Sequence, residues 1–281
     1  MALNLLKEFN SRYPSLDVYI SPREFIYAHA NSENLQQEQI AAFRVRDPDL
    51  IINAAGPTSI ADSIVNPEPY LGVPTSITRF LLEAIEATGN HIRIVQISTA
   101  SVYGECKDAP AHEESSLYPL SPYAEGKAIA DHLITQSAAD WIILRATSIY
   151  SNALNSRVLG LLREGLQKSA PITLGGSGEE LRDFMHLEDF AAAIYTLVAN
   201  KEARRNVFLV GSGRSVPISQ VAQIALNQRT VQNLEFSVSF DNSVRAGDPF
   251  AMVVDLTKIF SYGFSPLIQP DLGLSDYFQA N

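Results

Sequence analysis

The stretch IRIVQISTASVYGE, residues 92–105, joins an apolar run to a series of small hydroxyl-bearing residues. The apolar half has the nearly continuous hydrophobic character of a strand that is buried on both faces of a parallel sheet. The run ends in Ser98, Thr99, Ala100 and Ser101. In open α/β sheets, ligands bind beyond the carboxyl ends of the strands. The sequence therefore predicts a strand that brings Thr99 and its neighbours to a ligand-binding edge.

Strand and helix patterns alternate on both sides of this stretch. Upstream, DLIINAAG (49–56) has the pattern of a buried strand, and TSITRFLLEAIEATG (75–89) that of a helix ended by its glycine. Downstream, PYAEGKAIADHLITQSA (122–138) predicts a helix and DWIILRAT (140–147) the next strand. This alternation predicts an α/β fold, a Rossmann-like doubly wound parallel sheet with helices on both faces.

The remaining segments extend this organisation toward both ends of the chain. Further helical and strand patterns cover residues 2–13, 16–20, 24–30 and 35–46. After about residue 150 the alternation loosens into helices, short strands and loops. We therefore expect a Rossmann-like domain over residues 1–148 and a smaller C-terminal lobe over residues 149–281. Residues 186–211 are expected to pack on the first domain.

The composition excludes several classes of protein. The chain has 281 residues, of which 46% are hydrophobic, and a net charge of −10. Nucleic-acid affinity comes largely from Lys and Arg, so no nucleic-acid partner is expected. No apolar run reaches the ~18–20 residues of a membrane span, and the N-terminus lacks the features of a signal peptide. The one cysteine, Cys106, makes neither an internal disulfide nor a zinc cage, so we expect a cytoplasmic protein without a metal.

A tyrosine and a lysine lie four residues apart in SPYAEGK, residues 121–127. On a helix this spacing places Tyr123 and Lys127 on one face. A free phenol has a pKa of about 10, and a neighbouring ammonium lowers it. With Thr99 at the end of the preceding strand, the pair predicts a general acid/base for a sugar or alcohol hydroxyl. Such a pair is also common on solvated helix faces, which is the structural alternative.

Several motifs, taken in order, resemble those of one family. ISTASVYGE (97–105) is similar to a Ser/Thr-x-x-V-Y-G motif, SPYAEGK to a catalytic Tyr-x-x-x-Lys motif, and LRATSIY (144–150) to the strand that begins a substrate lobe. GGSGEELRDFMHLED (175–189) and VRAGDPF (244–250) resemble a G-x-G-x-x-x-R-D-F-x-H-x-x-D signature and an R-x-G-D segment. The chain thus resembles the extended short-chain dehydrogenase/reductases, the NAD-dependent epimerase/dehydratase family that modifies nucleotide sugars.

The resemblance implies a role for each matched residue. The implied catalytic residues are Thr99, Tyr123 and Lys127. The residues implied to contact NAD or NADP are Ala54, Ala55, Gly56, Ser98, Tyr123 and Lys127. Those implied to contact a nucleotide-diphosphate sugar are Thr99, Ser101, Ser148, Arg182, Arg245 and Asp248. For Arg182, the structural alternative is a salt bridge with Asp183 beneath the lobe.

The chain departs from the family at the start of the fold. It lacks the first strand and the Gly-x-x-Gly-x-x-Gly loop that cradles the cofactor pyrophosphate, and Met1 falls where the following helix begins in the family. The GSG at 211–213 is a poor substitute, and Ser21 and Arg23 in place of an acidic residue slightly favour NADP. We expect a shortened enzyme, a variant that binds cofactor weakly or through a rebuilt edge, or a non-catalytic relative, and we favour the first.

The residues that follow Thr99 narrow the reaction. A 4,6-dehydratase of this family has an Asp-Glu pair there, and this chain has Ala100 and Ser101. The resemblance therefore implies epimerisation or 4-keto reduction, in which Tyr123 exchanges the hydroxyl proton and Lys127 holds the nicotinamide ribose. The alternative is a Rossmann-like scaffold that has lost cofactor binding and binds a nucleotide sugar or a protein without catalysis.

The resemblance also implies a possible homodimer. Many relatives pair through the helix that carries the Tyr-x-x-x-Lys motif and the helix before it. The apolar residues that could form such a face are Leu81, Leu82, Ile85, Ile129 and Leu133. The alternative is that all of these residues belong to the core.

Overall fold

The computed structural model describes residues 48–89, 91–154, 157–229 and 235–279. Its central sheet has the strand order β1-β2-β3-β7. These strands are β1 (Leu50–Asn53), β2 (Arg93–Thr99), β3 (Asp140–Ala146) and β7 (Asn206–Val210). All neighbouring strands run parallel, as predicted. The patterns at residues 2–46, with Ser21 and Arg23, lie outside the described residues.

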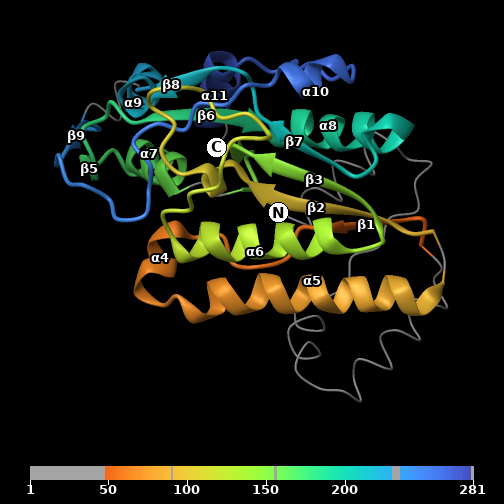
Figure 1. Cartoon of the computed structure of the whole chain (residues 1–281). Coiled ribbons are helices and arrows are strands. Elements are labelled where there is room, and N and C mark those ends of the chain that lie inside the picture. The colour runs from red at the N-terminus through yellow and green to blue at the C-terminus, as the bar shows by residue number, and fades with distance from the viewer. Residues whose placement is uncertain (1–47, 90, 155–156, 230–234, 280–281) are drawn as a thin grey trace.

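Helices cover both faces of this sheet, as Figure 1 shows. On one face lie α5 (Glu68–Thr88) and α6 (Pro122–Gln136), and on the other lies α8 (Leu187–Ala199). The short helix α4 (Ile60–Val65) precedes α5, and the 3-10 turn η1 (Ala100–Tyr103) follows β2. The predicted α/β fold with a parallel sheet and helices on both faces is therefore confirmed.

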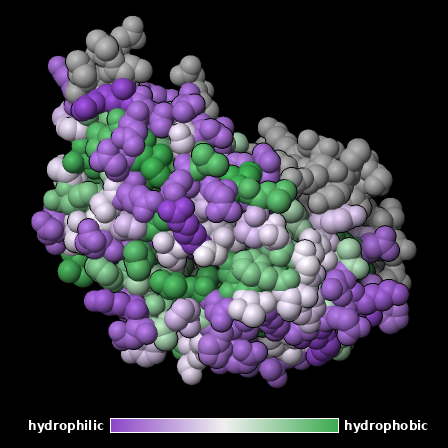
Figure 2. All heavy atoms as spheres, turned by 90° about the horizontal axis from the view of Figure 1, so that it is seen from above, coloured by the Kyte–Doolittle hydropathy of each residue, from purple (hydrophilic) through white to green (hydrophobic). Residues whose placement is uncertain are grey.

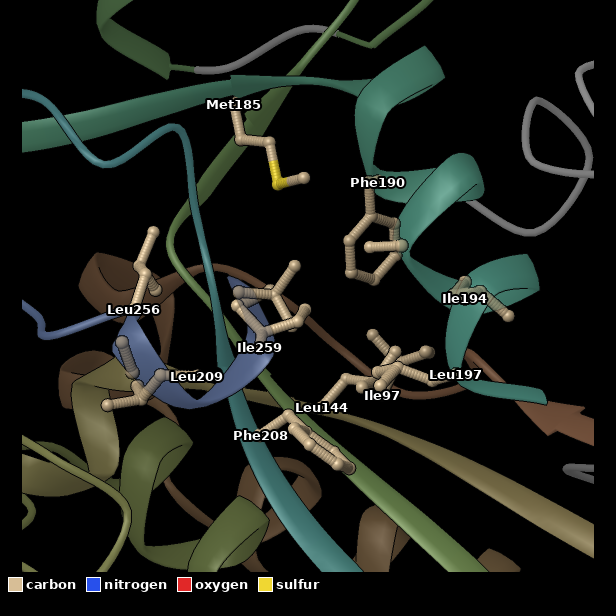
Figure 3. Close-up of a cluster of buried hydrophobic side chains, with 14 of the residues drawn as sticks. Ile97, Leu144, Met185, Phe190, Ile194, Leu197, Phe208, Leu209, Leu256 and Ile259 are labelled. Carbon is tan, nitrogen blue, oxygen red and sulfur yellow. The ribbon is translucent and has the colours of Figure 1, made fainter. Parts of the chain in front are cut away.

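The two faces of the sheet build two hydrophobic cores, because successive side chains of a strand point to opposite faces. The α5/α6 side includes Ile77, Leu81, Ile94, Ile134 and Ile143. The α8 side includes Ile97, Leu144, Phe190, Ile194, Leu197 and Phe208, which Figure 3 shows gathered in one cluster. A shift of β2 by one residue would exchange these two faces. The cores therefore fix the register that places Thr99 at the strand end.

The C-terminal lobe has sheets and a core of its own. One sheet contains β4 (Ser148–Tyr150), β6 (Leu181–His186) and β8 (Ser215–Pro217), and a second pairs β5 (Ile172–Leu174) with β9 (Val238–Phe240). The helices are α7 (Arg157–Lys168), α9 (Ile218–Asn227) and α11 (Pro270–Gln279). The buried cluster between them includes Tyr150, Leu162, Phe184, Val221, Phe236 and Leu274.

Two elements from the C-terminal half pack with the first domain, one as a strand of the central sheet and one as a helix on its face. β7 pairs with β3, and α8 contributes to the core on the sheet face that it covers. The short elements η2 (Lys201–Ala203) and α10 (Thr257–Ser261) lie beside them, with Ile259 of α10 in the same core. We propose a division at residue 148, with residues 186–211 assigned to the first domain.

The exposed and buried residues bear on two predictions, the absence of a membrane span and the dimer face. No helix in the described ranges is long and apolar enough to cross a membrane. Figure 2, seen from the side of α9, α10 and α11, shows apolar patches interspersed with polar residues. Leu81 and Ile85, named for a dimer face, are 5% and 7% exposed and lie in the α5/α6 core, whereas Ile129 is 39% exposed. Core packing is thus the correct interpretation for Leu81 and Ile85.

Candidate active site

Strand β1 ends in small residues at the carboxyl edge of the sheet. Asn53 is fixed there, because its Nδ2 donates to Gln96 Oε1 at 2.7 Å and its Oδ1 accepts the N–H of Ala55 at 3.3 Å. Ala54, Ala55 and Gly56 are half-buried, and Gly56 has a φ of 119°, which favours glycine. Ala54 and Ala55 also pack against the two hydrophobic cores on either face of the sheet. Because these residues have no side chain beyond Cβ, they are compatible with a ligand at this edge, and their contact with the cofactor stays a prediction.

Strand β2 ends at Thr99, the predicted catalytic hydroxyl. Thr99 caps η1, since its Oγ1 accepts the N–H of Ser101 and also donates to Ser101 Oγ, both at 3.1 Å. The turn closes at Gly104, whose N–H donates to the Ser101 carbonyl at 3.2 Å. Thr99 and Ser101 are 7% and 6% exposed. The turn therefore holds the two hydroxyls together at the end of the strand.

Helix α6 presents Tyr123 to this strand end. The hydroxyl of Ser121 accepts the N–H of Ala124 at 3.3 Å, which caps the helix, and Pro122 occupies its first position. Tyr123 therefore lies in the first turn, where it is half-buried and hydrogen-bonded to Thr99. The hydroxyl and the phenol, predicted to come from two consecutive β–α units to one site, are therefore neighbours.

Lys127 lies one turn further along α6. It is 5% exposed, and its Nζ donates to the carbonyl of Ile97 at 3.0 Å. Burial lowers the pKa of Lys127 to about 8, and Asp131 acts against that change. Burial raises the pKa of Tyr123, although the hydrogen bond with Thr99 lowers it. The predicted lowering of the Tyr123 pKa is therefore wrong for this structure, because desolvation of the phenol outweighs the hydrogen bond with Thr99 and the charge of Asp131 raises the pKa further.

A buried polar network lies behind these residues. Asp131 Oδ2 accepts a hydrogen bond from Ser98 Oγ at 2.9 Å and another from Arg145 Nε at 3.0 Å. Arg145 Nη1 donates to Tyr103 Oη at 2.7 Å. The hydroxyl of Ser98 is thus engaged with α6, and its predicted contact with the cofactor stays a prediction. Asp131 was missed, although its position four residues after Lys127 could have revealed it.

The predicted diphosphate ligand Arg182 makes contacts within the chain. Its Nη2 donates to Asp248 Oδ1 at 2.6 Å and to the Pro249 carbonyl at 2.7 Å. Its Nη1 donates to the carbonyls of Leu181 and Phe250 at 2.7 and 3.1 Å. The structure therefore supports the structural alternative for Arg182, with Asp248 as its partner in place of Asp183.

Arg245 is the more accessible of the two predicted arginines. Its side chain is 41% exposed, against 11% for Arg182, and its Nη1 lies 3.6 Å from Asp248 Oδ2. Asp248 therefore bridges a buried and an accessible guanidinium. Arg245 also flanks Gly175, since a Cβ at that glycine would lie 3.4 Å from the arginine Cδ. This geometry leaves Arg245 as the candidate for an anionic ligand.

Backbone N–H groups of the GSG segment, residues 211–213, are bonded within the protein. Asp183 Oδ1 accepts the N–H of Ser212 at 2.8 Å, and its Oδ2 accepts the N–H of Gly213 at 2.9 Å. Thr147 Oγ1 donates to the same carboxylate at 3.4 Å. These N–H groups hold an internal carboxylate, which agrees with the prediction that this segment is a poor phosphate site.

The remaining expectations concern Ser148 and metals. Ser148 begins β4 beside Phe184 and is half-buried, and its contact with substrate stays a prediction. Within the described ranges, no group of three or more His, Cys, Asp and Glu residues could hold a metal ion. His112 and Glu114 form an exposed pair at 3.2 Å, and burial raises the pKa of the free thiol of Cys106.

Comparisons with known proteins place the chain in a family. A model described as the NAD dependent epimerase/dehydratase family matches residues 19–211. The low-salt glycan biosynthesis protein Agl12 of Haloferax volcanii is 26% identical over 238 residues, which cover 83% of this chain and 75% of that protein. The CDP-paratose 2-epimerase of Salmonella typhi is 25% identical over 269 residues, covering 84% and 77%.

A solved structure shares the fold. The UDP-glucose 4-epimerase of Thermus thermophilus, crystallised with NAD, has a TM-score of 0.77 at 22% identity, with 87% of this chain and 82% of that chain covered. The family match spans more than half of the sequence and includes Thr99, Tyr123 and Lys127. The chain therefore belongs to the NAD-dependent epimerase/dehydratase family, whose members are NAD(P)-dependent oxidoreductases and isomerases.

Proposed function

We propose that this protein is an epimerase or a 4-keto reductase that acts on a nucleotide-diphosphate sugar and uses NAD or NADP. The observation that carries the proposal is the meeting of Thr99, Tyr123 and Lys127, with Tyr123 hydrogen-bonded to Thr99 and Lys127 buried one turn behind it. The relatives named as CDP-paratose and UDP-glucose epimerases support this substrate class. Ala100 and Ser101, in place of an acidic pair, disfavour dehydration.

Each residue has a defined part in the proposed mechanism. Tyr123 takes the proton of a sugar hydroxyl and returns a proton to the carbonyl oxygen in the reverse step. Thr99 donates a hydrogen bond to the same sugar oxygen. A bound nicotinamide ring supplies the acceptor or donor of the hydride. Because burial raises the pKa of Tyr123, formation of the phenolate needs a nearby cation, and Lys127, four residues along the same helix, is the candidate for that cation.

Cofactor titration tests this function directly. The purified chain is titrated with NAD⁺, NADH, NADP⁺ and NADPH by calorimetry, and any nucleotide that survives purification is identified by mass. We expect saturable binding of one cofactor pair, followed by epimer formation or 4-keto reduction with UDP- or dTDP-sugars. Absence of binding up to millimolar concentrations contradicts the proposal and favours the non-catalytic scaffold.

Arg245 is expected to hold the diphosphate. Arg245→Ala removes the accessible guanidinium and should raise KM for the nucleotide sugar about tenfold with a smaller change in kcat, since a charge-assisted hydrogen bond contributes roughly 1.5–3 kcal/mol. Steady-state kinetics measures both constants. Arg214→Ala is the matched control, because Arg214 is 47% exposed and paired with Asp271. An unchanged KM in Arg245→Ala rules out this role.

Two further proposals concern assembly and compartment. We propose a homodimer that pairs through the outer face of α5 and α6, where a shallow depression is lined by Leu71, Gly72, Thr75 and Ile129 among others. Sedimentation velocity checks it, and a mass of one chain at micromolar concentration contradicts it.

The buried, unpaired thiol of Cys106 supports the proposed reducing compartment, the cytoplasm.

A further inference from the structure

One face of α6 meets three consecutive residues of β2. Tyr123, Lys127 and Asp131 are spaced four residues apart and therefore share a helix face. Tyr123 is bonded to the hydroxyl of Thr99, Lys127 to the carbonyl of Ile97 at 3.0 Å, and Asp131 to the hydroxyl of Ser98 at 2.9 Å. A displacement of the helix along the strand would break all three contacts together.

Asp131 connects the helix to the sheet through its hydrogen bonds. It is 2% exposed, and its Oδ2 accepts hydrogen bonds from Ser98 on β2 and from Arg145 on β3. Its Oδ1 is buried and has no hydrogen-bond partner within the described part of the chain. Arg145 continues the network, since it donates to Tyr103 of η1 and its guanidinium carbon lies 5.0 Å from the centre of that ring. One carboxylate thus links α6, both central strands and the turn after Thr99.

The carboxylate of Asp131 also affects the protonation of Lys127. Asp131 favours the charged form of Lys127, and the same carboxylate accepts a hydrogen bond from Arg145 of β3, which in turn donates to Tyr103 of η1. Two of these side chains, Arg145 and Asp131, are 6% exposed or less, as is Lys127 itself. Burial raises the pKa of the Asp131 carboxyl, and Arg145, Ser98 and Lys127 act against that change. Without Asp131, Lys127 would lose the group that opposes the effect of burial on its pKa, so its charged form would be further disfavoured.

We propose that Asp131 is a positioning residue of the active site, whose carboxylate fixes α6 in register with the end of β2 and keeps Lys127 charged beside Tyr123. The proposal rests on the proposed function, because it assigns Asp131 a role in the work of Tyr123 and Lys127. Asp131 itself does not touch the reacting atoms. A purely structural ion pair is the competing explanation.

The same sheet contains a matched ion pair at its opposite end. Asp140 Oδ2 accepts from Arg93 Nε at 2.9 Å, and these two residues begin β3 and β2. Its Oδ1 is also buried without a hydrogen-bond partner in the described ranges. Loss of either carboxylate removes the partner of a largely buried arginine. Only Asp131 lies beside Lys127, so the pair of variants separates positioning from structure.

The test is a titration of Lys127 in the full chain without cofactor. The sequence has six lysines, so ¹³C-labelled lysine signals can be assigned with the help of Lys127→Met. The titration midpoint of Lys127, near 8 in the parent, is expected to fall by about one pH unit or more in Asp131→Asn. Asp140→Asn should leave the midpoint unchanged. A midpoint in folded Asp131→Asn equal to that of the parent overturns the proposal.

Asp131→Glu keeps the charge and displaces it by one methylene. This variant is the second test, and it replaces Asp131→Asn if that variant does not fold. We expect this variant to retain the Lys127 midpoint and to lower kcat by roughly tenfold with little change in KM, because a small misplacement of catalytic groups is costly. Parental kcat in Asp131→Glu overturns the positioning role. The lysine titration needs no turnover, so failure of the proposed function leaves its outcome interpretable.

Discussion

Replacement of Tyr123 by phenylalanine is expected to lower kcat by roughly 10²–10⁴-fold, the usual contribution of a positioned general acid/base. The change removes only the phenolic oxygen, which is bonded to Thr99, and keeps the half-buried ring. Cofactor affinity should therefore stay within about threefold of the parent value, since the ring still fills its place beside the strand end. Steady-state kinetics and calorimetric titration measure the two quantities separately.

Tyr118→Phe is the control for this experiment. Tyr118 lies in the segment before α6, is 72% exposed, and loses the same oxygen in its variant. It should keep parental kcat. If Tyr123→Phe also keeps parental kcat while it binds cofactor, Tyr123 is not the acid/base and the proposed mechanism fails. A loss of cofactor binding in Tyr123→Phe alone would instead assign the phenol to cofactor contact.

The sequence was sufficient to place the candidate catalytic residues, because their positions follow from local rules. The hydrophobic run before Thr99 predicts a buried strand, and parallel strands end at the edge where ligands bind. The spacing of Tyr123 and Lys127 requires one helix face. These two rules and the alternation of strands and helices bring the three side chains together without knowledge of any distant contact.

What the sequence could not supply were quantities that depend on the folded environment. The pKa of Tyr123 is raised because the phenol is desolvated, and its neighbours in sequence carry no information on that burial. The partner of Arg182 is Asp248, 66 residues later, and the motif alone did not reveal that the guanidinium is already satisfied. For Asp131, the spacing of four residues from Lys127 can be read from the sequence. Its hydrogen bonds with Ser98 and Arg145, which indicate its role, appear only in the folded structure.

The site also depends on how closely α6 approaches α5. Gly126 of α6 faces α5, and a Cβ there would overlap the carbonyl oxygen of Tyr70 and lie 2.9 Å from its carbonyl carbon. Pro74, four residues after Tyr70, has no N–H to bond that carbonyl as a regular helix would. The oxygen is thus free of this helical bond and faces the backbone of Gly126. Main-chain atoms of a helix cannot rotate aside as a side chain can.

Gly126→Ala is therefore expected to lower the free energy of unfolding by at least about 3 kcal/mol, the upper range for overpacking, and Tm by at least about 5 °C. Gly72→Ala is the matched control, because Gly72 is in α5 with no atom within 4 Å of an added Cβ. It should gain up to about 1 kcal/mol from helix propensity. Thermal and urea unfolding compare the two variants. If Gly126→Ala and Gly72→Ala have the same free energy of unfolding, the two helices can move apart without loss of stability. The packing of α6 on α5 would then not explain the position of Lys127, the residue after Gly126, against β2.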